Sequence, residues 1–215
     1  MKRIGIVVGG QICDYNGFRE AIEQMDRIIA CDSGARHLKA VELAPHLLVG
    51  DMDSIEPDIL RFFEESDVPT QRFRAEKDET DSELAVSLAL EEDVDEIHIF
   101  ANQGDRLDHL MANISLLYRI HRAGVKGFVH TDNQEIWLVE GTETITGTVG
   151  DTISFIPMGM KAEGVTLIGF QYPLIDYCYE HGTPIGISNR LAASEANVLV
   201  REGILIAIRT KETFL

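Results

Sequence analysis

Several features common in proteins are scarce or missing in this chain of 215 residues. It has only three cysteines, Cys13, Cys31 and Cys178, and none of them forms a CxxC pair or another metal-ligand spacing. An odd and scattered set argues against a disulfide framework or a zinc site, so we expect free thiols. The chain also lacks an apolar run of about 18 residues and an apolar signal-peptide stretch near its start. We therefore expect a cytoplasmic protein without a membrane span.

Basic residues are scarce as well. The chain has 19 Lys and Arg against 36 Asp and Glu, which gives a formal net charge of −17. A nucleic-acid partner is not expected, because such proteins gain affinity by neutralising backbone phosphates with Lys and Arg. A smaller phosphate ligand would need a metal cation or a local basic group. The motifs GxxxxGK(S/T), GxGxxG, GxSxG and HExxH are absent, and only Gly9-Gly10 follows the first apolar run.

The first part of the chain, residues 1–132, has the pattern of an α/β domain. Short apolar runs rich in β-branched residues alternate with segments of helical periodicity. Continuous apolar strands separated by helices indicate a three-layer fold, in which helices cover both faces of a parallel sheet. The expected strands are residues 4–8, 27–30, 47–49, 96–100 and 127–130. The expected helices are residues 18–25, 34–41, 57–65, 81–91 and 107–121.

The helical periodicity disappears in residues 133–215. Short strand-like runs follow one another there, and Gly or Pro stands in nearly every gap between them. This pattern predicts a second, all-β domain with an antiparallel sandwich or a small barrel. Its expected strands are residues 136–139, 142–146, 152–156, 164–167, 186–188, 197–200 and 204–208.

Acidic residues follow three of the expected strands of the α/β domain. Asp32-Ser33-Gly34 follows the second strand, Gly50–Ser54 follows the third, and Arg106–His109 follows the fourth after a short turn. Open parallel sheets bind ligands beyond the carboxyl ends of their strands. One acidic loop would be read as a solvated turn, but three on one rim indicate a binding site.

Asp51 and Asp53 have the spacing of a metal site. Two carboxylates at i and i+2 of a turn can face one cation, and Mg²⁺ is usually held by one or two carboxylates together with substrate phosphates. A DxD pair alone is weak evidence, since it also occurs in nucleotide-sugar transferases and in plain turns. Here Gly50 permits a close backbone approach, and Ser54 can cap the turn or donate to a phosphate.

A fourth acidic segment, Lys77–Asp81, precedes a helical pattern. Thr80 and Glu83 fit a capping box, which makes Asp81 the first residue of the helix. An acidic residue at that position can simply interact with the helix dipole, an effect of about 0.3–1 kcal/mol. The neighbouring acidic motifs favour a role for Asp81 in the site instead.

The last segment, Arg106–His109, opens another helix. Arg106 can bind phosphate oxygens with two parallel hydrogen bonds, or it can pair with Asp105 or Asp108. His109 lies one turn from an apolar face, so it is as consistent with packing as with catalysis.

Taken in order, these segments resemble the motifs of the thiamine pyrophosphokinase family. They match its Asp-Gly turn, its GDxDS, its KDxTD and its RxDH in Cys31–Ala35, Gly50–Ser54, Lys77–Asp81 and Arg106–His109. Residues 186–189 also resemble the thiamine-binding β domain of the family. The resemblance covers nearly the whole chain, and the ordered set is far more specific than any single segment.

The resemblance implies an enzyme that transfers pyrophosphate from ATP to the hydroxyl of thiamine, with Mg²⁺ as the metal. It also implies a homodimer with active sites at the subunit interface, between the α/β domain of one subunit and the β domain of the other. The expected metal ligands are Asp51, Asp53 and Asp81. Nucleotide contacts are expected from Asp32, Ser33, Gly34, Asp51, Ser54, Lys77, Asp78, Thr80, Arg106 and His109. The expected catalytic residues are Asp81, Asp108 and Arg106, and the expected thiamine contacts are Asp108, Ser188 and Asn189.

Transfer to an alcohol needs in-line positioning and charge neutralisation, and Asp108 is our first choice to accept the hydroxyl proton. Two other classes stay open. A metal-dependent nucleotide-sugar transferase or phosphohydrolase would use the DxD pair but would leave the KDxTD and RxDH segments unassigned. A non-catalytic sensor of a nucleotide or vitamin would not need the intact acidic set.

Overall fold

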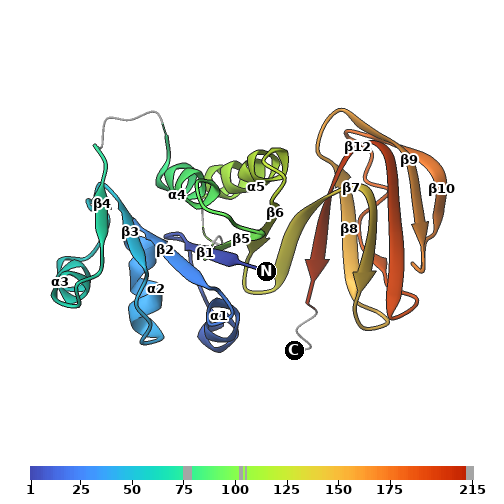
Figure 1. The fold of residues 1–215 in the computed structure, drawn as a ribbon. Helices are drawn as coiled ribbons and strands as arrows, with labels where there is room; N and C mark the ends of the chain where they lie inside the picture. The colour runs from blue at the N-terminus through green and yellow to red at the C-terminus, as the bar shows by residue number, and fades with distance from the viewer. Residues whose placement is uncertain (75–78, 102–103, 105, 212–215) are drawn as a thin grey trace. The chain divides into compact units, whose positions relative to one another are not determined.

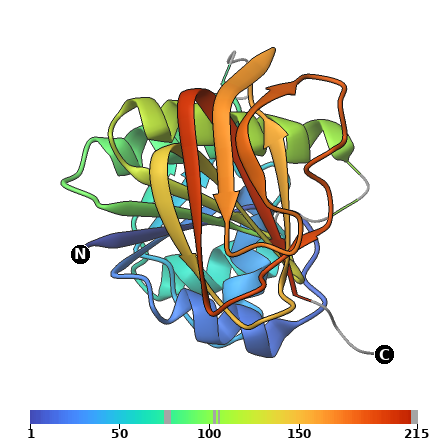
Figure 2. The same ribbon diagram turned by 90° about the vertical axis from the view of Figure 1, so that its right-hand side faces the viewer.

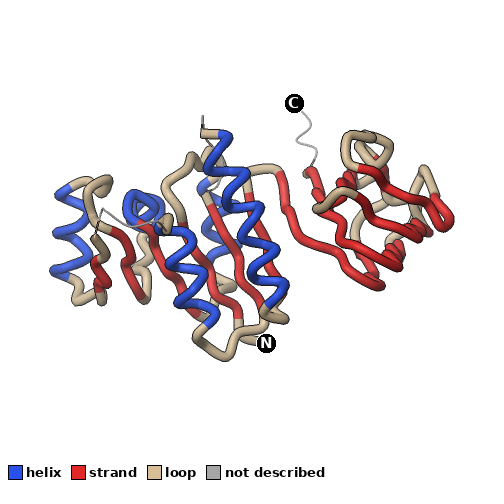
Figure 3. Tube along the Cα trace, turned by 90° about the horizontal axis from the view of Figure 1, so that it is seen from above, coloured by secondary structure: helices blue, strands red, loops and turns tan. Residues whose placement is uncertain are grey.

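The structure is a computed structural model, and it describes residues 1–74, 79–101, 104 and 106–211 (Figure 1). The chain divides into two compact units, Met1–Asp132 and Asn133–Leu215. Helices and strands alternate in the first unit, whereas the second consists of strands and loops (Figure 3). The described part of the chain contains no helix that is both long and apolar enough to cross a membrane.

The first unit is built on a parallel sheet with the strand order β6-β5-β1-β2-β3-β4. Helices α1, α2 and α3 lie on one face of this sheet, and α4 and α5 lie on the other (Figure 1). The predicted three-layer α/β fold is confirmed. The strands are β1 (Arg3–Val7), β2 (Arg27–Cys31), β3 (Leu47–Gly50), β4 (Thr70–Arg72), β5 (Glu96–Phe100) and β6 (Lys126–His130). The helices are α1 (Tyr15–Ile22), the 3-10 helix η1 (Asp32–Gly34), α2 (Ala35–Ala40), α3 (Pro57–Glu65), α4 (Asp81–Leu90) and α5 (Leu107–Arg122).

The central strands are apolar because both of their faces are covered. In β1, β2 and β5 the last four residues of each strand are buried. Their side chains join those of α1, α2 and α3 in a core that includes Phe18, Leu38 and Phe63. This burial fixes the strand ends, so the loops that follow them start from a rigid base.

Two local features of the first unit differ from the prediction. Strand β4 was not expected, because Thr70–Arg72 is short and polar and lies at the edge of the sheet beside β3. Helix α1 begins at Tyr15, three residues before the expected start at Phe18, because the Asp14 side chain caps it by accepting a hydrogen bond from Gly17 N.

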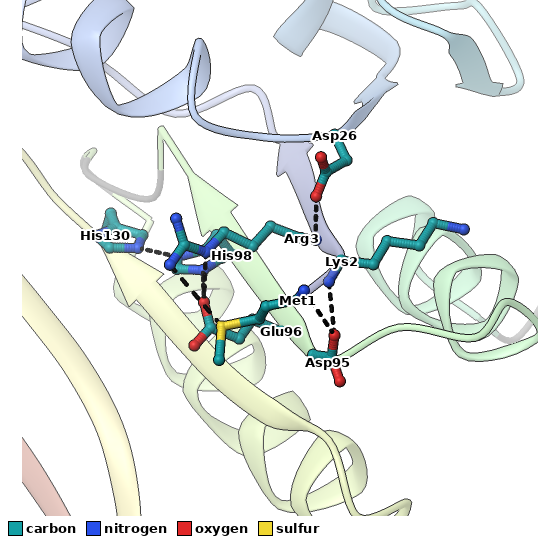
Figure 4. Close-up of polar contacts among 8 residues, drawn as sticks. All are labelled: Met1, Lys2, Arg3, Asp26, Asp95, Glu96, His98 and His130. Atoms are coloured by element: carbon teal, nitrogen blue, oxygen red, sulfur yellow. Dashed lines mark hydrogen bonds and ion pairs between the residues drawn. The ribbon is translucent and has the colours of Figure 1, made fainter.

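A polar network ties β1 to its neighbours at one end of the sheet (Figure 4). The Arg3 guanidinium donates from Nε to Glu96 Oε2 over 2.9 Å, and the same oxygen lies 3.3 Å from His98 Nε2. His98 Nδ1 lies 2.9 Å from His130 Nε2 on β6. Three adjacent strands are therefore joined by side chains as well as by the backbone.

The second unit is antiparallel, as predicted (Figure 2). Its longest strand, β12, pairs with β7 along both of its halves. From Asn197 to Glu202, β12 also pairs with β9, and from Leu205 to Thr210 it pairs with β8. The strands are β7 (Gln134–Thr146), β8 (Thr152–Pro157), β9 (Lys161–Ile168), β10 (Leu174–Glu180), β11 (Asn189–Arg190) and β12 (Glu195–Thr210).

The prediction of a strand over residues 186–188 is wrong. These residues form a turn, and Ser188 has a φ of 58°. Strand β10, which was not predicted, pairs with β9 through two register shifts, and Asp176 within it has a φ of 49°. Such irregular pairing hides the alternation of apolar and polar residues that a strand prediction relies on.

Candidate functional site

The first unit carries a cleft of about 580 Å³ at the carboxyl ends of its central strands. Its walls come from the loops after β1, β2, β3 and β5 and from the N-terminal turns of α4 and α5, which is where open parallel sheets bind ligands. The lining residues are Val8, Gly9, Gly10, Gln11, Cys31, Asp32, Ser33, Arg36, Ser54, Glu79, Thr80, Asp81, Ser82, Ala101, Gly104, Arg106, His109 and Asn113.

Asp32 holds a strained position at the end of β2. Its φ is 42°, it is 6% exposed, and its Oδ1 accepts a hydrogen bond of 3.0 Å from Met52 N. Gly50 makes room for this carboxylate, because a Cβ at residue 50 would lie 2.0 Å from Asp32 Oδ1. The φ of Gly50, 147°, is also one that residues with a side chain rarely adopt. The sequence Gly50-Asp51-Met52 thus fixes Asp32 through both shape and hydrogen bonding.

Three carboxylates gather beside the cleft. Asp32, Asp51 and Asp53 each offer one oxygen, and these oxygens lie within 4.8 Å of one another. The turn that carries the DxD pair is held by a bond of 3.0 Å from Asp53 N to Asp51 Oδ1. The structure brings the predicted pair together and adds Asp32, the residue that also lines the cleft.

The acidic surroundings change the titration of Asp32. Burial raises the pKa of Asp32 to about 7, and the hydrogen-bonded and negatively charged Asp81 carboxylate adds to this rise. The hydrogen bond from Met52 N acts in the opposite direction, and the charge of Asp51 raises the pKa further. Asp81 therefore lies against Asp32 at the edge of the acidic cluster, close to its predicted place.

Helix α4 presents Asp81 to the cleft as expected. Thr80 is the N-cap, and its Oγ1 accepts a hydrogen bond of 3.2 Å from Glu83 N. The Glu83 carboxylate pairs with Arg119 of α5 at 3.0 Å. The Cys31 thiol donates to Asp81 O over 3.6 Å, which joins the end of β2 to the start of α4.

Arg106 and Asp108 form a bidentate pair before α5. Arg106 Nε donates to Asp108 Oδ1 over 2.9 Å, and Arg106 Nη2 donates to Asp108 Oδ2 over 2.7 Å. The guanidinium holds the pKa of Asp108 well below its usual range. Arg106 and His109 line the cleft, whereas Asp108 is not among the described residues that line it. For Asp108 to accept a proton, the role predicted for it from the sequence, this pair would have to open.

A second wall of the cleft was not predicted from the sequence. Arg36 of α2 donates from Nη2 to Gly9 O over 2.7 Å and to Gly10 O over 2.9 Å. His37, which is buried, places Nε2 2.8 Å from Gly10 O and Nδ1 2.8 Å from the Tyr15 hydroxyl. The pair Gly9-Gly10 is visible in the sequence, but the residues that hold this loop, Arg36 and His37, come from helix α2.

The other residues predicted to bind the nucleotide or thiamine lie in both units. Ser33 and Ser54 line the cleft, and Gly34 packs so closely that a Cβ there would lie 2.2 Å from Val7 O. Ser188 is exposed in the second unit, and its backbone N donates to Ser154 Oγ over 3.0 Å. The predicted set also contained Lys77 and Asp78, which lie outside the described residues.

Asn189 is buried in the second unit, where its side chain has local partners. Its Oδ1 accepts from Tyr172 N over 3.0 Å, and its Nδ2 donates to Tyr172 O over 2.8 Å. These bonds fix the turn that carries Ser188. An effect of Asn189 on a ligand would therefore arise through the position of that turn.

The chemistry of the donor set fits a hard divalent cation. Carboxylate oxygens are the preferred ligands of Mg²⁺, and a cation would relieve the repulsion among Asp32, Asp51 and Asp53. The arrangement is typical of sites at which substrate phosphates complete the coordination. Guanidinium groups in the same cleft suit the remaining phosphate oxygens.

An α/β unit with a strand-end cleft, a carboxylate cluster and guanidinium groups is typical of metal-dependent enzymes that act on phosphate esters. The comparisons with known proteins define the family. Residues 18–129 match the model of the catalytic domain of thiamin pyrophosphokinase, and residues 142–205 match the model of its vitamin B1 binding domain. The chain belongs to the thiamin pyrophosphokinase family.

Individual relatives agree with this assignment. Thiamine pyrophosphokinase from Bacillus subtilis (strain 168) is 34% identical over 217 residues, which cover 99% of this chain and 100% of the relative. A crystal structure of the Bacillus subtilis protein has a TM-score of 0.88 at 32% identity and covers 98% and 100% of the two chains. The thiamin pyrophosphokinase of Geobacillus thermodenitrificans has a TM-score of 0.86 at 29% identity, with 98% of each chain covered.

Proposed function

We propose that the protein is a thiamine pyrophosphokinase, which transfers the pyrophosphate of ATP to the hydroxyl of thiamine in the cytoplasm. The hydroxyl oxygen bonds to the β-phosphorus, the bond from that phosphorus to the α,β-bridging oxygen breaks, and AMP leaves. The products are thiamine diphosphate, AMP and the hydroxyl proton. The observation that carries the proposal is the cleft, in which Asp32 belongs both to the wall and to the carboxylate cluster.

In this proposal Asp32, Asp51 and Asp53 hold Mg²⁺, and Asp81 supports them through its contact with Asp32. The metal would supply neutralisation of the phosphate charges. The chain itself would orient ATP with the loops after β1, β2 and β5, and Arg106 would contact phosphate oxygens once it is released from Asp108. Lys77 and Asp78 keep the nucleotide contacts expected for their motif.

We also propose a homodimer with active sites at the subunit interface. Ser188 and Asn189 of the β unit would act on thiamine, Ser188 by direct contact and Asn189 through the turn that it fixes. The support is the match of residues 142–205 to the vitamin B1 binding domain of the family. A cationic substrate such as thiamine also suits a chain with a formal net charge of −17.

A product assay tests the reaction directly. The protein is incubated with ATP, thiamine and Mg²⁺, and the nucleotides and thiamine esters are separated by chromatography. We expect AMP and thiamine diphosphate in equal amounts, with no ADP and no thiamine monophosphate. The control omits thiamine and should release no AMP.

Three results would contradict the proposal. Stoichiometric ADP would mean that the γ-phosphate is transferred. Release of AMP or phosphate at the same rate without thiamine would indicate a hydrolase. Binding without any turnover would indicate a sensor.

A further inference from the structure

The N–H donors of Arg36 fall into two sets. Its Nη2 donates to Gly9 O and Gly10 O, which fastens the loop after β1 to helix α2. Its Nε and Nη1 make no hydrogen bond with the described residues, and the side chain lines the cleft. An arginine guanidinium carries five N–H donors, so the loop, which takes only Nη2, leaves the Nε and Nη1 donors available.

The charge of Arg36 is not balanced by a carboxylate of the described chain. Arg106, the other arginine among the described lining residues, is paired with Asp108 in two hydrogen bonds. Arg36 bonds to neutral carbonyl oxygens instead. Its guanidinium therefore lines, without an ion pair to a described carboxylate, a cleft that also contains Asp32 and Asp81.

The loop held by Arg36 is fastened from a second side. Gly10 O also faces His37 Nε2 at 2.8 Å, and the other ring nitrogen faces the Tyr15 hydroxyl at 2.8 Å. If the Tyr15 hydroxyl donates to Nδ1, the neutral ring can donate from Nε2 to Gly10 O. Gly9 fits against Ser33 so tightly that a Cβ would lie 2.2 Å from Ser33 Oγ. Arg36 is thus preorganised, because the loop that fixes its guanidinium cannot easily shift.

We propose that Arg36 binds the polyphosphate of ATP through the Nε and Nη1 donors of its guanidinium, while Tyr15 and His37 position the loop that holds it. This inference rests on the proposed function and adds a phosphate contact that lies outside the motifs. The Nε and Nη1 donors point to different sides of the guanidinium, so each can meet a separate phosphate oxygen, and such charge-assisted bonds are about twice as strong as neutral ones. Tyr15 and His37 act only through the loop and touch no ligand.

Steady-state kinetics and direct binding test this assignment. For Arg36→Gln we expect a KM for ATP at least about 30-fold higher, with the KM for thiamine changed less than about threefold. Calorimetry should show a similar loss for α,β-methylene-ATP, which cannot release AMP, and a smaller loss for AMP. Arg36→Lys keeps the charge but not the separate Nε and Nη1 donors, so it should lie between the wild type and Arg36→Gln.

The controls separate binding from folding. Arg61→Gln, an exposed arginine of α3, should leave both KM values and the affinity for the analogue unchanged. Tyr15→Phe removes one hydrogen bond of the positioning pair and should raise the KM for ATP only about two- to threefold. Thermal unfolding of each variant reports whether the first unit is folded.

Each arm has an outcome that overturns the assignment. Unchanged affinity of folded Arg36→Gln for α,β-methylene-ATP would remove Arg36 from the phosphate site. Equal rises in both KM values would mean that the substitution disturbs the whole cleft, and equal behaviour of the Lys and Gln variants would exclude a role for the charge. If Arg36→Gln does not fold, Arg36→Lys decides by the same comparison. If the wild type binds the analogue but produces no AMP, the proposed function fails while the binding arm still decides the role of Arg36.

Discussion

His98 Nδ1 lies 2.9 Å from His130 Nε2, although the two residues belong to different strands. Strand pairing sets His98 opposite Phe128, and all three rings stack nearly parallel. A neutral ring on each side satisfies this bond with one donor and one acceptor. The pair therefore places two titratable groups within the covered part of the sheet.

Burial lowers the pKa of His98, and this outweighs the Glu96 carboxylate, which raises it. The folded pKa of His98 lies below the unfolded value of about 6.5. The contribution of neutral His98 to stability is therefore complete above about pH 6.5 and is lost as the pH falls through the folded pKa. The difference in thermal unfolding temperature between the wild type and His98→Gln should therefore change in favour of the variant as the pH falls from about 8 to 5.5. His181→Gln, at an exposed turn, is the control and should keep the wild-type dependence. An equal pH dependence in all three proteins would show that His98 does not set it.

Asp51→Asn and Asp53→Asn test the carboxylate cluster. Each substitution removes one charge and preserves volume, and in Asp51→Asn the new amide oxygen can still accept a hydrogen bond from Asp53 N. We expect turnover to fall by at least about 100-fold at limiting Mg²⁺. The unfolding temperature should change little, because these side chains lie in a solvent-accessible turn. Near-normal turnover of either variant would remove that residue from the metal site.

Asp32→Asn should separate stability from activity. The pKa of Asp32 is raised from 3.8 to about 7, so the metal-free protein loses stability as the pH rises through this interval. Removing the charge should stabilise the metal-free protein at about pH 8 by on the order of 2 kcal/mol, with little difference at about pH 4. Activity should be lost. Denaturant unfolding in EDTA measures the effect, and a variant that is less stable than the wild type at the higher pH would contradict it.

Gly50→Ala should damage the site more than a strained backbone alone would. The new Cβ would lie 2.0 Å from Asp32 Oδ1, and the φ of 147° adds strain of about 1–3 kcal/mol. Gly124→Ala is the matched control, because Gly124 has a φ of 78° but no atom within 4 Å of an added Cβ. We expect both variants to lose stability and only Gly50→Ala to lose Mg²⁺-dependent activity. Equal activity in the two would argue against the packing of Gly50 on Asp32.

Shared active sites can be tested by mixing subunits. Asp81→Asn and Ser188→Trp should each inactivate the protein alone. If each site combines the two units from different subunits, a co-refolded equal mixture should recover about a quarter of the wild-type activity, because half of the dimers then carry one intact site. No recovery, with dimers present by sedimentation, would make shared sites untenable.

The sequence was sufficient for features that are encoded locally. The apolar runs of β1, β2 and β5 and the acidic loops after two of them are visible as continuous patterns, so the parallel sheet and the cleft could be predicted. Strand β4 could not, because its residues are polar and only the neighbouring β3 makes them a strand.

The third member of the carboxylate cluster shows a different limit. Asp81 was expected as a metal ligand beside the DxD pair, whereas the structure groups Asp32 with that pair and sets Asp81 against Asp32. This depends on the φ of 42° at Asp32, which no local pattern reports. Arg36 was missed for a related reason, because its partners lie 26 and 27 residues away.

The double pairing of β12 also determines when the second unit can form during synthesis. Strands β7, β8 and β9 all pair with β12, which is the last described strand in the sequence. The ribosome therefore completes every strand of the first unit by His130, while the β unit waits for about 80 further residues, roughly ten seconds at typical elongation rates. Until then β7 has no strand partner within its own unit, so its pairing with β12 waits although the α/β unit has already been synthesised.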